Sequence, residues 1–258
     1  MKTEATRARR ALRLLALATG LAACAGAWGM DVRVAAQETI APKWVAQPER
    51  VTGICPDVMA AIERIEPRLH FTGYRRSRSL PGIEAGLESG SLDAACGLIP
   101  TQRRRAIAVP TGKPVYMIRH LLAARAGDPA MVRDLQDLVR LGALVTSQRG
   151  SAFTDHLKAA GVKVDDATDD NRVNLNKILA GHGRFAYVNE MALQHYIRSE
   201  RLGSRLRVLP AVLAAEPSYF WVSRKADPAL AGLLGAAIDK LSANGELERI
   251  RTRWLATR

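Results

Sequence analysis

The sequence predicts an α/β protein with two lobes, and three observations support this expectation. Expected strands and helices alternate along the chain, and the alternation starts again near residue 143. Such alternation is typical of α/β layers with a mostly parallel sheet. Beyond its first 29 residues, the chain of 258 is also longer than one small hydrophobic core requires. With 48% hydrophobic and 24% charged residues, the composition excludes collagen-like, low-complexity and disulfide-scaffold proteins.

In the first half of the chain, hydrophobic spacing and capping residues define the expected elements. Apolar residues recur at helical spacing from Val58 to Ile65, behind Pro56, which favours a helix start. A second helix is expected to begin after Ser79 and to end at Gly90. The expected strands cover 31–36, 69–71, 93–98 and 117–125, with a loop over 44–53 and a short helix at about 130–140.

The second half repeats the alternation of strands and helices. Strands are expected over 143–146, 162–164, 184–188, 206–209 and 219–222, and helices over 152–160, 173–179, 190–198, from 228 and over 246–255. Ligands of open α/β sheets bind beyond the carboxyl ends of the strands. The cleft between two such lobes is therefore the expected site.

Residues 1–29 predict an export signal. A basic stretch precedes an almost wholly apolar run over 11–27, which is too short for a membrane span and ends in small residues. In one interpretation, the signal peptide is cleaved before Met30 and the protein is released in soluble form. In the other, residues 21–24 match a bacterial lipobox, in which Cys24 is acylated and becomes the new N-terminus. Both readings place the folded part outside the cytoplasm, in the periplasm.

Export changes what the remaining cysteines imply. Cys55 and Cys96 form an even pair in an oxidising compartment, where a disulfide and two buried free thiols are both open. No histidine pattern near them indicates a metal, and we expect neither a metal nor a cofactor.

The chain is strongly basic, with a formal net charge of +13. Such a surface can attract nucleic acid, anionic lipid or small anionic solutes. Only 5% of residues are aromatic, and no zinc-ligand spacing or basic helix stripe is present. These features argue against a nucleic-acid partner.

Several short motifs follow one another in a characteristic order. The first half contains Gly90-Ser91-Leu92-Asp93-Ala94, Thr101-Gln102-Arg103-Arg104 and Lys113-Pro114-Val115-Tyr116. The second half contains Asp134–Leu138, Gln148-Arg149-Gly150-Ser151, Arg224–Leu230, Asn244-Gly245 and Arg253-Trp254-Leu255. In order and spacing, the chain resembles the family 3 extracellular solute-binding proteins, the polar amino-acid receptors of ABC importers.

The resemblance implies a type II periplasmic-binding-protein-like fold that closes around a small carboxylate-bearing solute. Lobe 1 would comprise residues 30–119 and 215–258, and lobe 2 residues 120–214, with crossovers at 117–125 and 219–223. Because ligand contacts with both lobes exist only in the closed state, binding would favour closure. The implied partners are a membrane permease and its cytoplasmic ATPase, and a monomer is expected.

Arg104 occupies the family's position for the arginine that binds the ligand's carboxylate. A guanidinium offers a planar fork that can grip a carboxylate with two hydrogen bonds. Arg103 and Arg105 flank it, so the register could differ by one residue. We expect Arg104 to be solvated in an open, empty cleft, and its removal to leave folding nearly unchanged. Thr101 can donate to the ligand or cap the turn locally.

Four further residues are candidates for ligand binding. Gly150 and Ser151 open a helix whose free N–H groups suit an anion, although an ordinary helix cap has the same pattern. Glu190 falls where the family commonly has an Asp that accepts the ligand's ammonium group, with Asn189 as the nearest substitute. Trp44 follows a proline where the family usually has an aromatic wall, and it could equally cover the lobe's core.

Two other functions remain open from the sequence. A few proteins on this scaffold are dehydratases in which a carboxylate in the cleft acts as general acid and base. Glu190 beside Arg104 could serve in that way, although no common catalytic motif is present. The third possibility is a binding module that signals to a receptor rather than to an importer.

Overall fold

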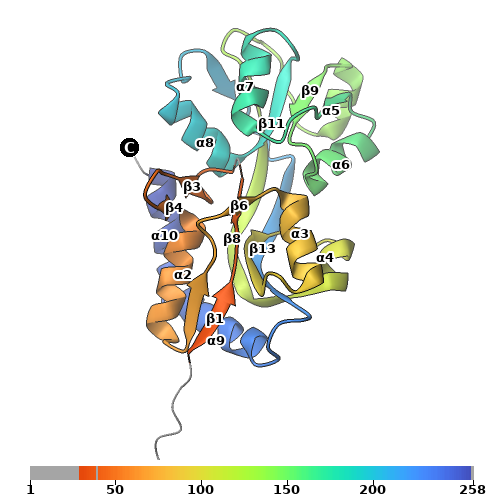
Figure 1. Cartoon of the computed structure of the whole chain (residues 1–258). Coiled ribbons are helices and arrows are strands. Elements are labelled where there is room, and N and C mark those ends of the chain that lie inside the picture. Colours follow the sequence, from red (N-terminus) through yellow and green to blue (C-terminus); the bar gives the residue numbers. More distant parts are fainter. Residues whose placement is uncertain (1–28, 39, 257–258) are drawn as a thin grey trace, which may run out of the picture.

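Two long strands connect the two lobes of the protein in the computed structural model, which describes residues 29–38 and 40–256 (Figure 1). They are β8 (Ala108–Arg125) and β13 (Ala214–Ser223), which pair antiparallel from His120 opposite Ala214 to Ala108 opposite Ser223. The amino-terminal part of β8 lies in one lobe and its carboxyl-terminal part lies in the other (Figure 1). This ribbon is therefore the mechanical link between the lobes.

The first lobe is built around three strand pairs and a hairpin. β1 pairs parallel with β5, β2 pairs parallel with β6, and β7 pairs antiparallel with β13. Its strands are β1 (Met30–Arg33), β2 (Ala36–Gln37), β3 (Val45–Ala46), β4 (Val51–Thr52), β5 (Leu69–Thr72), β6 (Ser77–Arg78) and β7 (Ala94–Leu98). Its helices are α2 (Ile54–Ile65), α3 (Leu80–Ser89), α4 (Gln102–Ile107), α9 (Leu230–Ala243) and α10 (Glu246–Ala256).

The second lobe carries a sheet in the order β10-β9-β11-β8, with β12 also paired to β8. β9, β10 and β11 are parallel to one another, and β8 runs against them. Its strands are β9 (Val145–Ser147), β10 (Val164–Asp165), β11 (Phe185–Asn189) and β12 (Leu206–Val208), and its helices are α5 (Leu135–Leu141), α6 (Ala152–Ala159), α7 (Asn171–Leu179) and α8 (Glu190–Ser199).

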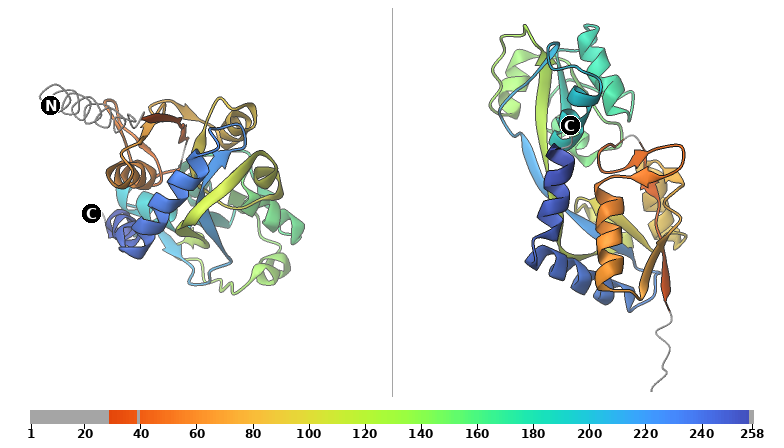
Figure 2. Two further views of the ribbon diagram at one scale, coloured as in Figure 1. Left: turned by 90° about the horizontal axis from the view of Figure 1, so that it is seen from below. Right: turned by 90° about the vertical axis from the view of Figure 1, so that its left-hand side faces the viewer.

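The buried apolar residues fall into clusters that mainly respect the two lobes. The clusters of the first lobe draw on α2, α3, α9 and β13, and those of the second draw on β9, β11 and the helices around them. At the C-terminal end, α10 lies beside α2 (Figure 2). There the Trp254 indole N–H donates to the Asp57 carboxylate at 2.8 Å. We retain 30–119 with 215–258, and 120–214, as the proposed lobes.

Local sequence signals match the structure where they are strongest. Ser79 caps α3 by accepting from the Gly82 N–H at 3.3 Å, and Gly90 ends the helix in the left-handed conformation. Several elements were not expected: the β3–β4 hairpin, β6, the helix α4, the first nine residues of β8 and the first five of β13. No helix in the described ranges is long and apolar enough to cross a membrane. The proposed export signal and Cys24 lie outside those ranges.

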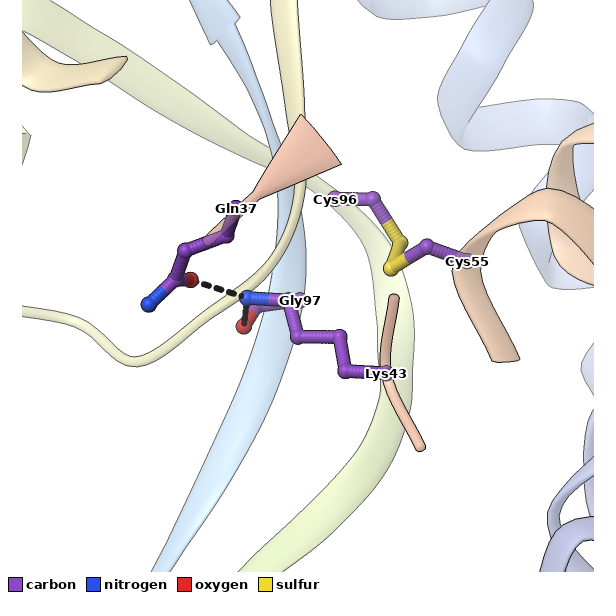
Figure 3. The surroundings of a disulfide bond; sticks show 5 residues. All are labelled: Gln37, Lys43, Cys55, Cys96 and Gly97. Carbon is purple, nitrogen blue, oxygen red and sulfur yellow. Dashed lines mark hydrogen bonds between the residues drawn. A yellow bond between two sulfur atoms is a disulfide. The ribbon is translucent and has the colours of Figure 1, made fainter. Parts of the chain in front are cut away.

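Cys55 and Cys96 form a disulfide with a Cα–Cα distance of 5.9 Å. It ties the first turn of α2 to β7, and both cysteines are buried. Figure 3 shows the bond beside the Lys43 side chain and Gly97. The cross-link therefore joins a helix and a strand at the edge of the lobe that faces its partner lobe.

Reduction of this disulfide should lower the free energy of unfolding by about 2–4 kcal/mol, because the bond closes a loop of some 40 residues in the unfolded chain. Urea denaturation with and without reductant measures the change. When the denatured protein is alkylated before reduction, mass spectrometry should show that Cys55 and Cys96 are unmodified. Alkylation of either residue in the unreduced protein would show that the bond is absent.

Candidate functional site

A cavity of about 600 Å³, partly open to solvent, lies between the two lobes. The first lobe contributes Gln37, Ile40, Ala41, Pro42, Lys43, Leu80, Gly97, Leu98, Ile99, Arg104, Tyr116 and Ile118, and the second contributes His120, Gln148, Ser151, Ala152, Phe153, Asn189 and Met191. A bound solute would touch both lobes.

Arg104 lies in the wall of this cavity and is held by the first lobe. Thr101 caps α4 by accepting the Arg104 N–H at 3.2 Å, which sets the start of the helix. The guanidinium donates from Nε to Glu84 at 2.9 Å and from Nη1 to the Ile99 carbonyl at 2.8 Å. Its Nη2 has no hydrogen bond within the described residues, so this nitrogen remains able to bind a solute.

The expectation that Arg104 is solvated is wrong. The residue is only 4% exposed and pairs with Glu84, so its removal would also disturb the protein around it. Of the three neighbouring arginines, Arg104 alone lines the cavity, since Arg103 and Arg105 are exposed and do not line it. Arg103 nevertheless contacts the same carboxylate, with Nε 3.1 Å from Glu84. Thr101 acts as a helix cap and does not line the cavity.

Ser151 reaches the cavity from the second lobe, at the start of α6. Its hydroxyl accepts the Phe153 N–H at 3.3 Å and caps the helix. Gly150 is exposed, with φ of 72°, and does not line the cavity. The backbone conformation at Gly150 explains the glycine, because side chains rarely adopt that region. Ser151 therefore faces Arg104's lobe across the cleft, whereas Gly150 shapes the loop before it.

Glu190 does not lie in this cavity. It lines a separate groove beside α10 and lies 3.5 Å from Arg119. Asn189, the residue before it, lines the cavity and caps α8 by accepting the N–H groups of Met191 and Ala192. Because the Asn189 oxygen is used in this way, its NH2 group is left as a donor toward the cleft. The second lobe thus presents an amide where the resemblance implied an acid.

Trp44 is buried in the core of the first lobe and does not line the cavity. Its ring packs against Tyr74 at a centroid distance of 6.3 Å. The apolar part of the cavity wall comes instead from residues such as Ile40, Pro42 and Phe153. Phe153 stacks on the His120 ring at 3.8 Å, which gives the second lobe a flat aromatic surface.

Lys43, which sequence reasoning missed, is the second cationic side chain of the cavity. It is 4% exposed, and its Nζ donates to the Gln37 side-chain oxygen and to the Gly97 carbonyl, both at 2.7 Å (Figure 3). The only signal in the sequence was its place between Pro42 and Trp44. Lysines are almost never fully buried without a partner, so periodicity alone assigns such a residue to the surface.

Gly97 is required where Lys43 approaches the strand. Its φ is 75°, and a Cβ at this position would lie 2.8 Å from both the Lys43 Cε and the Tyr116 hydroxyl. The same Cβ would lie 3.4 Å from the Cys55 sulfur. A larger residue would push the lysine out of its place, so both the backbone conformation and the packing require a glycine at this position.

The cavity wall carries two basic side chains, Arg104 and Lys43. Burial lowers the pKa of Arg104, and the Glu84 carboxylate opposes that shift. Burial, and to a lesser extent the charge of Arg104, lowers the pKa of Lys43 well below its ordinary value. Burial also lowers the pKa of His120 to about 3, so this imidazole is neutral at physiological pH. None of the described residues that line the cavity is an Asp or a Glu.

The lowered pKa of Lys43 predicts a pH dependence of stability. Between that pKa and about 10.5, the unfolded chain binds one more proton than the folded protein. The free energy of unfolding therefore rises with pH in this window, by up to about 1.4 kcal/mol per unit. Lys43→Met should lose this slope when urea denaturation is compared from neutral pH to about 10. A wild-type minus variant difference that is constant over this range would refute the shift.

Comparisons with known proteins agree with this architecture. The family model described as bacterial extracellular solute-binding proteins, family 3, matches residues 32–257. No curated protein matches the sequence significantly. A histidine kinase sensor domain with similarity to periplasmic binding proteins has a TM-score of 0.77 and 21% identity, covering 89% of this chain and 97% of its own.

Two solved binding proteins share the fold at low identity. The GluR0 ligand-binding core in complex with L-glutamate has a TM-score of 0.76 and 19% identity, covering 88% of this chain and 99% of its own. The arginine-, lysine-, histidine-binding protein ArtJ from Geobacillus stearothermophilus has a TM-score of 0.70 and 16% identity, covering 89% and 96%. With its two lobes and the cavity between them, the chain belongs to the family 3 bacterial extracellular solute-binding proteins.

Proposed function

We propose that the protein is a receptor that binds a small carboxylate-bearing solute, an amino acid or a related organic acid, between its lobes. The observation that carries this proposal is the buried Arg104 guanidinium in the cavity wall, with Nη2 free of protein partners in the described residues. An arginine held at two of its nitrogens is already oriented, so little side-chain entropy is lost when a carboxylate binds.

The second lobe supplies the rest of the proposed site. Ser151 lies at the start of α6, whose dipole favours an anion, and Asn189 offers an amide donor. A solute bound to Arg104 reaches these groups only when the lobes are close together. Binding therefore shifts the population toward the closed arrangement, with β8 and β13 as the connection that bends.

We further propose that the receptor acts outside the cytoplasm, as a monomer, and delivers its solute to an ABC permease. Importer receptors and sensor domains share this fold, so uptake must be measured directly. Cells that lack the gene should lose uptake of the labelled solute and regain it with the wild-type gene. A transcriptional response that is lost while uptake is unchanged would assign the protein to signalling instead.

A dehydratase-like activity has no geometric support in the cavity. That mechanism needs a carboxylate beside the bound acid to donate and accept the proton. Glu190 faces the groove beside α10, and Glu84 is occupied by Arg104 and Arg103. Binding without chemistry is the function that this donor set favours.

Arg104→Ala should weaken binding of a carboxylate solute by about thirtyfold or more, because it removes the charged partner from a desolvated pair at a cost of about 2–5 kcal/mol. Arg104→Lys should recover only part of this loss, since an ammonium lacks the planar fork. A thermal-shift screen of amino acids and dicarboxylates identifies the solute, and titration calorimetry measures its affinity.

Arg103→Ala is the matched control for this test. It removes a charge from the same Glu84, but its side chain is 64% exposed and lies outside the cavity. Its affinity should stay within about threefold of wild type, because exposed pairs contribute little. A large loss of affinity in Arg103→Ala, together with wild-type affinity in a folded Arg104→Ala, would show that Arg103 binds the carboxylate and that Arg104 does not.

A further inference from the structure

Lys43 is a buried cation without an acidic partner. Its Nζ is held by the Gln37 side chain and the Gly97 carbonyl, and no carboxylate within the described residues forms an ion pair with it. An ammonium group has three donors, so two acceptors leave one N–H unused. A buried charge with neither counter-ion nor full hydrogen bonding is costly. The missing partner is an anion, and Lys43 lines the cavity in which a solute would bring one.

Lys43 and Arg104 donate to two carbonyl groups of the same short segment of chain. Lys43 donates to the carbonyl of Gly97, and Arg104 donates to that of Ile99. Two residues of extended chain place equivalent atoms at most about 7 Å apart. The cations are close enough for the charge of Arg104 to affect the titration of Lys43. One short molecule can therefore reach both of them.

The cavity is ill suited to a cationic group. An α-ammonium needs an acid or several oxygen acceptors, and the described lining contains no Asp or Glu. The Asn189 oxygen is already used by the helix that it caps, and Glu190 lies in the other groove. An ammonium bound here would lie near the Arg104 guanidinium and a second basic side chain, Lys43, with only neutral acceptors such as Gln148 in the described lining.

We propose that the cleft selects a short dicarboxylate that lacks an ammonium group, with one carboxylate bound by Arg104 and the other by Lys43. This inference rests on the proposed carboxylate-binding function and adds the class of solute and a second binding residue. Lys43 supplies a point charge to the second carboxylate, whereas Arg104 supplies a planar fork to the first.

The competing explanation is that Lys43 only stabilises the cavity wall. A neutral amine has two N–H groups, which is the number of acceptors that it contacts. In that case removal of the Lys43 side chain would alter the stability of the protein and would weaken the binding of all solutes to a similar extent. Selectivity between solutes with one carboxylate and solutes with two separates the two roles. A residue that only stabilises the wall does not distinguish these solutes.

The first experiment uses the wild-type protein and matched acids. Calorimetry compares glutarate with butyrate, which lacks one carboxylate, and with L-glutamate, which adds an ammonium group; succinate and adipate vary the length. The best dicarboxylate should bind about thirtyfold or more tightly than butyrate, because it gains a second desolvated charge pair. It should also bind at least about tenfold more tightly than L-glutamate, whose ammonium would be left unpaired.

The second experiment compares variants. Lys43→Met keeps the length and apolar stem but removes the charge, so the ratio of dicarboxylate to butyrate affinity should fall to within about threefold. Lys240→Met removes an exposed lysine of the same lobe and should leave the ratio unchanged. The wild-type comparison needs no variant, so the proposal stays testable if Lys43→Met does not fold.

The outcomes separate this inference from the proposed function. Butyrate or L-glutamate binding as tightly as every dicarboxylate would overturn the inference while leaving a carboxylate receptor intact. An unchanged ratio of dicarboxylate to butyrate affinity in folded Lys43→Met would likewise show that Lys43 only stabilises the wall. If no carboxylate binds the wild-type protein at all, the proposed function fails and the inference falls with it.

Discussion

The burial of two cations at the end of β7 is the constraint on which the rest of the site depends. Arg104 is stabilised by Glu84 from α3 and by the Ile99 carbonyl, whereas Lys43 has only neutral acceptors. These contacts require that α3, α4 and the strand end meet at one place. They also require Gly97, because any side chain there would occupy the position of the Lys43 stem. The Cys55–Cys96 disulfide, next to this glycine, holds the strand against α2 (Figure 3).

The unequal partners of the two basic side chains would give them unequal roles in the proposed receptor. Glu84 compensates the charge of Arg104 in the empty cleft, so the arginine is ready to bind before a solute arrives. No carboxylate pairs with Lys43 in the described residues, so burial lowers its pKa and favours the neutral amine in the empty cleft. An anion that enters restores the balance and favours the charged form. Binding of a second carboxylate is therefore coupled to uptake of a proton by Lys43 wherever the empty cleft holds the neutral amine.

Much of the fold could be predicted because its signals are local. The Ser79 cap, the left-handed Gly90 and the apolar spacing of α2 each act within one helix. By contrast, the start of β8 is set by pairing with β13, about a hundred residues away, which no local pattern reports. Arg104 was found from its motif, but its burial and its pairing with Glu84 depend on packing between α3 and α4. Lys43 could not be found, because burial of a lysine is decided by tertiary neighbours.

The difference between Asn189 and Glu190 shows how little sequence separates one solute class from another. Both residues lie at the start of α8, yet only Asn189 faces the cavity, because one residue of a helix turns the side chain by about 100°. The family resemblance placed an acid at this point of the chain, and the helix directs that acid into the groove beside α10. The fold, which many binding proteins and sensors share, does not decide the solute. In the proposed receptor this decision would fall to a few cleft residues, and two of them are basic side chains in a described lining that contains no acid.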